Sequence, residues 1–131
     1  MRIPQIVFGS GLVVLLVLFS IPQRHPLRYN PSTEQMVRGT VTEVREFYCP
    51  ISGHEGTHLM LATKNGIVEV HVAPVNFLVT QRWDFSRGDQ VEVSGSRILF
   101  HGHNALIART ILRNDRTIAL RDAGGKPMWL D

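Results

Sequence analysis

The sequence predicts a small, mainly β domain of five strands and one short helix, preceded by a single transmembrane helix. Three observations support this expectation. An apolar, uncharged segment lies close to the amino terminus, and short runs of alternating apolar and polar residues begin at residue 36. One apolar run between the third and fourth predicted strands has helical spacing instead. A chain of 131 residues has room for one such domain.

Residues 6–21 read IVFGSGLVVLLVLFSI, in which 12 of 16 residues are apolar and none is charged. Extended back to Ile3, the segment approaches the roughly 20 residues that cross a bilayer. Arg2 supplies the positive start of a signal sequence, but no A-x-A-like cleavage site follows the apolar run. We therefore expect residues 1–23 to form an uncleaved signal anchor, with a cleaved signal peptide as the alternative.

The basic residues around the span give conflicting indications of its orientation. Arg24 and Arg28 follow the span and only Arg2 precedes it, a distribution that favours a cytoplasmic domain under the positive-inside rule. An amino-terminal signal anchor, however, usually exports the chain that follows it. We expect a single-pass protein of the inner membrane with its domain on the periplasmic side, and Arg2, Arg24 and Arg28 at the lipid interface.

Residues 24–35 are expected to form a linker, because the chain from 22 to 35 contains three prolines and few apolar residues. The domain then occupies residues 36–131. Its strands are expected at 37–48, 57–63, 67–73, 87–100 and 104–113, with a helix at 74–83 and a possible terminal hairpin of 117–122 with 126–130.

The pair Asn65-Gly66 lies between two alternating runs and predicts a β-hairpin with a two-residue turn. Such a turn would place Met60 opposite His71. One face of the hairpin would then be the core face, and it would carry Leu59, Leu61, Val68, Val70 and Val72. The other face would carry His58, Met60, Glu69 and His71.

The order of long strand, hairpin, short helix and two further strands is that of the five-stranded OB-fold barrel. An SH3-like barrel is the alternative, although it would lack the helix after the third strand. Five segments also resemble a group of small exported bacterial OB-fold proteins over residues 36–131. These segments are GTVTEV (39–44), GTHLMLAT (56–63), VEVHVAPVNFL (68–78), GDQVEVSGS (88–96) and LRDAGGKPMW (120–129). The resemblance implies the fold and an exported location, and it transfers no catalytic residue.

A metal site is the most specific chemistry that the sequence offers. Cys49, His54 and His58 have the spacing C-x4-H-x3-H, and the predicted hairpin places Met60 and His71 on the same face as His58. Thiolate, imidazole and thioether ligands suit copper best and zinc second. The favoured interpretation is nevertheless that Cys49 is a small buried apolar residue and that the histidines lie in exposed turns. We therefore expect no cofactor, with a copper or zinc site as the alternative.

Nucleic-acid binding is a weaker expectation, although OB-fold barrels often bind single strands. The net charge of +3 is accounted for by Arg2, Arg24 and Arg28, because residues 34–131 contain eleven basic and eleven acidic side chains. A neutral domain gains little from releasing counterions from phosphates. We therefore expect nucleic acid not to be the partner.

The sequence contains no nucleophile elbow, no phosphate-binding loop and no C-x-x-C-H motif, so we expect a binding module and not an enzyme. The expected role is that of an accessory subunit of a membrane or envelope complex that handles electrons or metals. Trp129, Arg109 and Arg113 are the candidate contacts to protein partners. A periplasmic copper protein is the principal alternative, and an OB-fold protein that binds single-stranded nucleic acid is the second.

Overall fold

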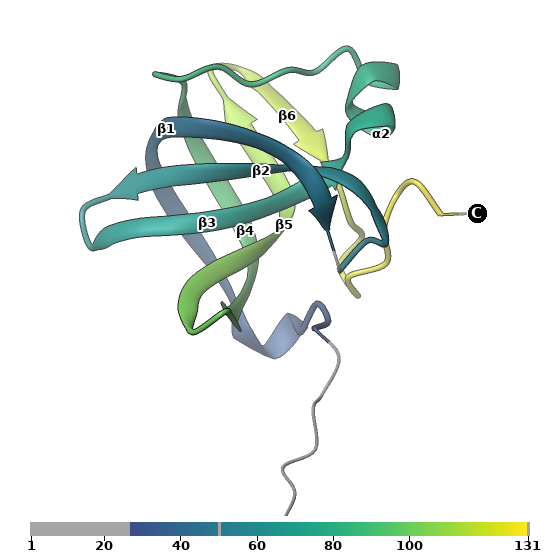
Figure 1. Ribbon diagram of the computed structural model, residues 1–131, viewed down its shortest axis with the longest axis horizontal. Helices are drawn as coiled ribbons and strands as arrows, with labels where there is room; N and C mark the ends of the chain where they lie inside the picture. Colours follow the sequence, from purple (N-terminus) through teal and green to yellow (C-terminus); the bar gives the residue numbers. More distant parts are fainter. Residues whose placement is uncertain (1–26, 50, 131) are drawn as a thin grey trace, which may run out of the picture.

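The computed structural model describes residues 27–49 and 51–130, which form six strands in one sheet and one short α-helix (Figure 1). In chain order the elements are the 3-10 turn η2 (Pro31–Thr33), β1 (Glu34–Cys49), β2 (His54–Thr63), β3 (Gly66–Pro74), α2 (Val75–Thr80), β4 (Gln90–Phe100), β5 (His103–Arg113) and β6 (Arg116–Ala119). The prediction of a mainly β domain with a single short helix after the third strand is confirmed.

The sheet closes on itself. Its strand order is β3-β2-β1-β4-β5-β6, and an additional parallel pairing joins β3 to β5. That pairing has three register positions, from Glu69 opposite Ala105 to His71 opposite Ile107. The pairings β1–β2, β2–β3, β3–β5, β5–β4 and β4–β1 therefore form a ring, and β6 lies outside it on β5.

Two glycines allow the long strands to bend around the ring. β1 pairs with β4 up to Thr40 and with β2 from Thr40 onward, and Gly39 lies at this change of partner. A Cβ atom on Gly39 would lie 2.5 Å from the carbonyl oxygen of Ala62. Gly95 follows a bulge in β4, and a Cβ atom there would collide with the backbone of Ile107. Side chains at these positions would block the close approach of neighbouring strands.

The ring encloses an apolar core. Leu59, Leu61, Val70 and Val72 are buried in it, and Val68 packs against it, as the predicted hairpin face requires. The other strands contribute Val41, Val91, Val93, Leu106, Ala108 and Ile111, while Leu78, Trp83, Ile118 and Leu120 cover its ends. At about 25 cal/mol per Å² of apolar surface removed from water, this burial is the main source of the domain's stability.

The hairpin register differs from the predicted one by two residues. Thr63 is opposite Gly66, so the turn residues are Lys64 and Asn65, and Met60 is opposite Glu69. Gly66 has a φ of 115°, which favours glycine, and the Thr63 hydroxyl donates to its carbonyl oxygen at 2.8 Å. A shift of two residues leaves every side chain on its predicted face, because the period of a strand is two.

The predicted terminal hairpin is present only near its turn. Arg121 pairs with Pro127 in an isolated antiparallel bridge, and the N–H groups of Asp122 and Met128 donate to the carbonyl oxygens of Lys126 and Leu120 at 3.0 and 2.9 Å. Residues 116–119 pair with β5 instead and form β6. The predicted helix is also shorter than expected. It ends at Thr80, and Arg82 then adopts a φ of 53° that leads Trp83 back into the core.

The expected anchor, residues 1–23, lies outside the described residues. Among the residues that the structure does describe, no helix is long and apolar enough to cross a membrane. Residues 31–35 of the expected linker lie in η2 and in the start of β1. Asn30 donates its backbone N–H to the Ser96 hydroxyl at 2.9 Å, so this segment packs on β4.

We predict that Gly95→Ala lowers the free energy of unfolding by about 2 kcal/mol or more, because the new methyl group meets backbone atoms that cannot turn aside. Chemical denaturation followed by circular dichroism measures this change. Gly124→Ala is the control, since its Cβ would find only ordinary contact with Asp122 at 3.5 Å. Equal stability of the two variants would contradict the proposed packing constraint.

Candidate metal centre

Cys49, His58 and His71 come together from three neighbouring strands. Cys49 is the last residue of β1, and His58 lies directly opposite His71 in the pairing of β2 with β3. A bulge at Thr57 and His58 shifts the register at that point. The three side chains lie outside the apolar core of the ring, yet only 4%, 1% and 1% of their residue surfaces are exposed. A second buried layer therefore covers this part of the outer sheet face.

Gly56 allows Cys49 to lie close to β2. A Cβ atom on Gly56 would be 3.2 Å from the Cys49 Cβ, which is tighter than an ordinary contact. Residues 51–53 form a turn, in which Gly53 donates its N–H to the Cys49 carbonyl oxygen at 2.8 Å. The short turn and the missing side chain together fix the thiol above the histidines.

The candidate ligand atoms of the three residues all lie within 4.8 Å of one another. The Sγ atom of Cys49 is 3.6 Å from Nδ1 of His71, and the two imidazole centroids are 4.0 Å apart. Among the described residues, Nε2 of His58 and Nε2 of His71 are buried without a hydrogen-bond partner. A buried polar atom without a partner costs about 1–3 kcal/mol, so two in one cluster need an explanation.

Glu69 orients His58. The Nδ1–H of His58 donates to Oε1 of Glu69 at 3.1 Å, which leaves Nε2 as the nitrogen with a free lone pair. A carboxylate on the far nitrogen of an imidazole is the usual partner of a metal-ligating histidine, because it fixes the tautomer and the ring orientation. Sequence analysis placed Glu69 on this face of the hairpin but assigned no such role to it.

The ionisation of Cys49 also fits a ligand. Burial alone would raise the pKa of the Cys49 thiol, but the adjacent imidazoles of His58 and His71 and hydrogen bonds from the backbone N–H groups of Ser52 and Ile51 lower it to about 5. Burial acts to lower the pKa of His58, and the nearby Cys49 and Glu69 outweigh that effect and raise it. The thiolate, which is the form that binds metals, is therefore the resting state of Cys49 at neutral pH.

Aromatic rings close the site on two sides. Phe47 lies edge-on against His58 with centroids 4.2 Å apart, and Phe100 does the same against His71 at 4.5 Å. The space that remains between Cys49, the histidines and Arg121 is a cavity of about 10 Å³, close to the volume of one water or ion. Neither phenylalanine was singled out for this role by sequence analysis, since an aromatic residue on a strand is most often part of the core.

The other two predicted ligands are not part of this cluster. His54 is exposed at the start of β2, opposite Cys49 in the strand register, and it is not among the grouped ligand residues. Met60 is half-buried opposite Glu69, and it does not line the small cavity. The donor set that the described residues bring together is therefore one thiolate and two imidazoles.

The residues expected to contact protein partners make contacts within the domain. Arg109 forms an ion pair with Glu34, and Arg113 pairs with Asp89 at 3.0 Å and lies 4.7 Å from the Trp83 ring. Trp129 packs on Phe77 with centroids 5.3 Å apart. Their role in partner binding stays a prediction. Of the arginines expected at the membrane, Arg28 is exposed, and Arg2 and Arg24 lie outside the described residues.

We predict that Cys49 titrates with a pKa of about 5 in the metal-free protein. The ultraviolet absorbance of the thiolate measures this directly, because the chain has a single cysteine. His71→Ala should move the midpoint toward that of an ordinary thiol, about 8.5, since one of the stabilising hydrogen bonds is lost. His103→Ala, at an exposed position, should leave it unchanged. An unshifted midpoint in the unmodified chain would show that the imidazoles do not stabilise the thiolate.

Comparison with known proteins gives one family match. The model of the MamS/MamX magnetosome protein family matches residues 33–118. The matched range contains all five strands of the ring, together with Cys49, His58, Glu69 and His71. No curated protein matches the chain.

The match covers well over half of the 131 residues, and it falls on the folded domain and not on the apolar amino-terminal segment. The chain belongs to the MamS/MamX magnetosome protein family.

Proposed function

We propose that this protein is a membrane-anchored accessory protein of magnetosome formation that binds one transition-metal ion through Cys49, His58 and His71. The single observation that carries the metal assignment is the buried cluster itself. A thiolate and two imidazoles converge within 4.8 Å, with unpartnered nitrogens and a carboxylate behind one ring. The family match supports the accessory role in a membrane-associated complex with protein partners.

Copper in its reduced state is the metal that we favour. Thiolate and imidazole ligands suit both copper and zinc, but structural zinc almost always takes four protein ligands. The described residues supply three. A soft monovalent ion also balances the charge of a single thiolate. An ion bound at these residues would serve either as stored metal or as an electron-transfer centre.

The fold that we propose is the OB-fold barrel. The ring order β1-β2-β3-β5-β4, the parallel contact of β3 with β5 and the helix between β3 and β4 all support it. Such a barrel also serves as a nucleic-acid platform, but the balanced charge of residues 34–131 argues against that role here. We propose a binding and not a catalytic function.

The proposed location is the inner membrane, with residues 1–23 as the anchor and the domain on the extracytoplasmic side. The support is the length and apolarity of residues 6–21 and the absence of a cleavage motif after them. A free thiol in an oxidising compartment must be protected from oxidation. The burial of Cys49 beneath the turn at residues 51–53 provides that protection.

We predict that the chelator-treated full chain takes up about one reduced copper ion and binds it more tightly than zinc. Competition with a chromogenic copper chelator measures the affinity. Cys49→Ser, His58→Ala and His71→Ala should each weaken binding at least about a hundredfold, and Glu69→Gln about tenfold through loss of ring orientation.

Three control variants complete this experiment. His103→Ala, His54→Ala and Met60→Leu should keep the affinity of the unmodified chain, because none of these residues belongs to the cluster. Equal affinity in all variants would reject the site. Tighter binding of zinc than of copper would reject the choice of metal and leave the ligand set in place.

We predict that the full chain fractionates with membranes and that Leu15→Arg combined with Leu16→Arg releases it. Each arginine at the centre of a span costs about 2.5–3.5 kcal/mol of insertion free energy. Leu99→Arg, at a position 68% exposed in the domain, is the matched control and should stay with the membrane. Recovery of the unmodified chain in the soluble fraction would contradict the anchor.

A further inference from the structure

A second cavity lies beside the metal centre. It has a volume of about 400 Å³ and is bounded by the start of the described chain, the turn after β1 and the carboxyl-terminal segment. Ser52 and Arg121 line both this cavity and the small one at Cys49. The two spaces therefore adjoin, and Arg121 lies between them.

Arg121 is buried, with 5% of its surface exposed. Its Nη1 donates to the carbonyl oxygens of Val72, at 3.2 Å, and Ala108. Its Cζ lies 4.8 Å from the centre of the Trp129 ring. These contacts hold the guanidinium in one orientation, but a carbonyl oxygen carries no charge. Within residues 27–49 and 51–130, no carboxylate lies within 4.0 Å of it.

The charge of Arg121 is not removed by burial. Desolvation lowers the pKa of Arg121 to about 10, so the guanidinium remains cationic at neutral pH. A buried cation without an ionic partner is costly, and proteins normally supply an anion or a counter-charge. The thiolate of Cys49 attracts it, but a metal bound at Cys49 would take that charge.

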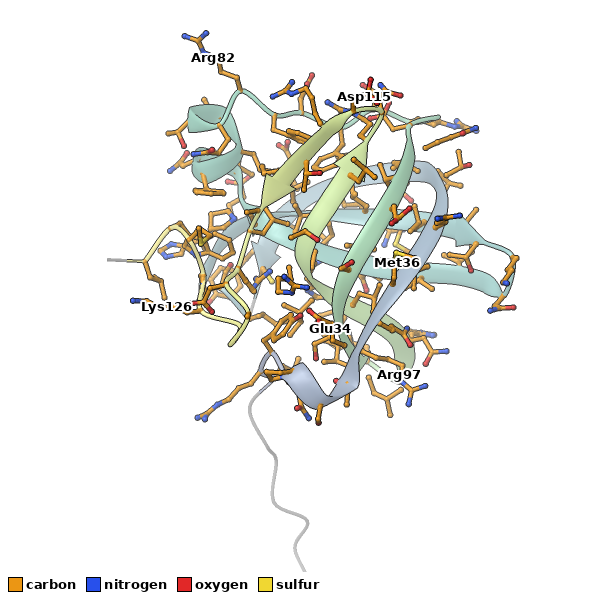
Figure 2. The ribbon with its side chains drawn as sticks, turned by 180° about the vertical axis from the view of Figure 1, so that it is seen from behind. Glu34, Met36, Arg82, Arg97, Asp115 and Lys126 are labelled. Atoms are coloured by element: carbon orange, nitrogen blue, oxygen red, sulfur yellow. The ribbon has the colours of Figure 1, made fainter. Side chains whose placement is uncertain are left out.

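The rim of the larger cavity is also basic. Among the described residues that line it, Arg28 and Lys126 are basic and none is acidic. Lys126 extends into solvent from the carboxyl-terminal segment (Figure 2). The nearest acidic neighbour in sequence, Asp122, uses its carboxylate to accept the N–H groups of Gly124 and Lys126 at 3.0 and 2.9 Å. It stabilises the turn and is not among the lining residues.

We propose that this cavity binds a small oxyanion, a carboxylate or a phosphate, with Arg121 as the buried recognition residue and Arg28 and Lys126 as cations at the rim. A planar guanidinium fixed by two backbone carbonyl groups presents its remaining N–H groups in a set direction, which suits the paired oxygens of such anions. Trp129 and Tyr29 also line the cavity. Arg121 also lines the small cavity at Cys49, but the anion would bind on the side of the second cavity, which Arg28 and Lys126 line.

Calorimetric titration of the metal-free full chain in a mild non-ionic detergent tests this site. The probes are inorganic phosphate, citrate and a short-chain phosphatidylglycerol. Saturable binding of any of them supports oxyanion recognition. The pattern of responses identifies where the anion comes from. Binding of the phosphatidylglycerol alone indicates a lipid headgroup, and binding of phosphate or citrate indicates a soluble anion.

Variants locate the binding. Arg121→Lys keeps the charge but loses the paired donors, and it should weaken binding at least about tenfold. Lys126→Ala should weaken it about threefold, as loss of one solvated charge at the rim does. Lys64→Ala is the matched control, since it removes the chain's other lysine, which is exposed in the β2–β3 turn, and it should change the affinity less than twofold.

Two results would overturn the proposal. One is the absence of saturable binding of all three probes to the folded, unmodified chain. The other is an equal loss of affinity in Lys64→Ala and Lys126→Ala, which would indicate general attraction to a basic surface. If Arg121→Lys does not fold, Arg28→Ala combined with Lys126→Ala carries the comparison, because both side chains are exposed.

Discussion

The parallel contact between β3 and β5 is the interaction on which the rest of the molecule depends. It has only three register positions, yet it closes the ring of strands. Two of its β3 residues, Glu69 and His71, are parts of the candidate metal centre. Immediately beyond the contact, Arg121 donates to carbonyl oxygens of both strands, at Val72 and Ala108. A side chain thus continues the bridge where the backbone ladder ends, and the strand pairing that closes the ring also positions His71 and Glu69.

The histidines of the candidate metal centre are polar residues buried on the outside of the ring of strands. An outer strand face normally stays in contact with water, and histidines on such a face keep the hydration of both ring nitrogens. Here the end of β1, Phe100 and the turn after Cys49 cover the face, so His58 and His71 lose their hydration without gaining partners for both nitrogens. Purely structural packing would favour apolar residues at these positions. The polar cluster is therefore better explained by a ligand than by stability.

Sequence patterns predicted the core face and the hairpin of this domain because strand periodicity and turn signals are local. The alternation of Leu59, Leu61, Val70 and Val72 identified the core face, and Asn65-Gly66 located the hairpin to within two residues. The same alternation placed His58 and His71 together, since parity survives a register shift of two. The features that the sequence did not predict are contacts between residues far apart in the chain. No pattern in the sequence indicates that Gly56 leaves room for Cys49, that residues 116–119 pair with β5, or that Arg121 reaches across from the carboxyl-terminal segment.

The basic residues are unevenly distributed along the chain. The basic excess of the chain lies at Arg2, Arg24 and Arg28, and the domain as a whole is balanced. The charges are nevertheless unevenly placed. Arg28, Lys126 and the buried Arg121 all line one cavity, and none of its lining residues within 27–49 and 51–130 is acidic. The metal ligands fall within the range matched by the family model, residues 33–118, whereas these three cations fall outside it. The family match therefore bears on the strand framework that holds Cys49, His58 and His71, and it does not extend to the three cations of the second cavity.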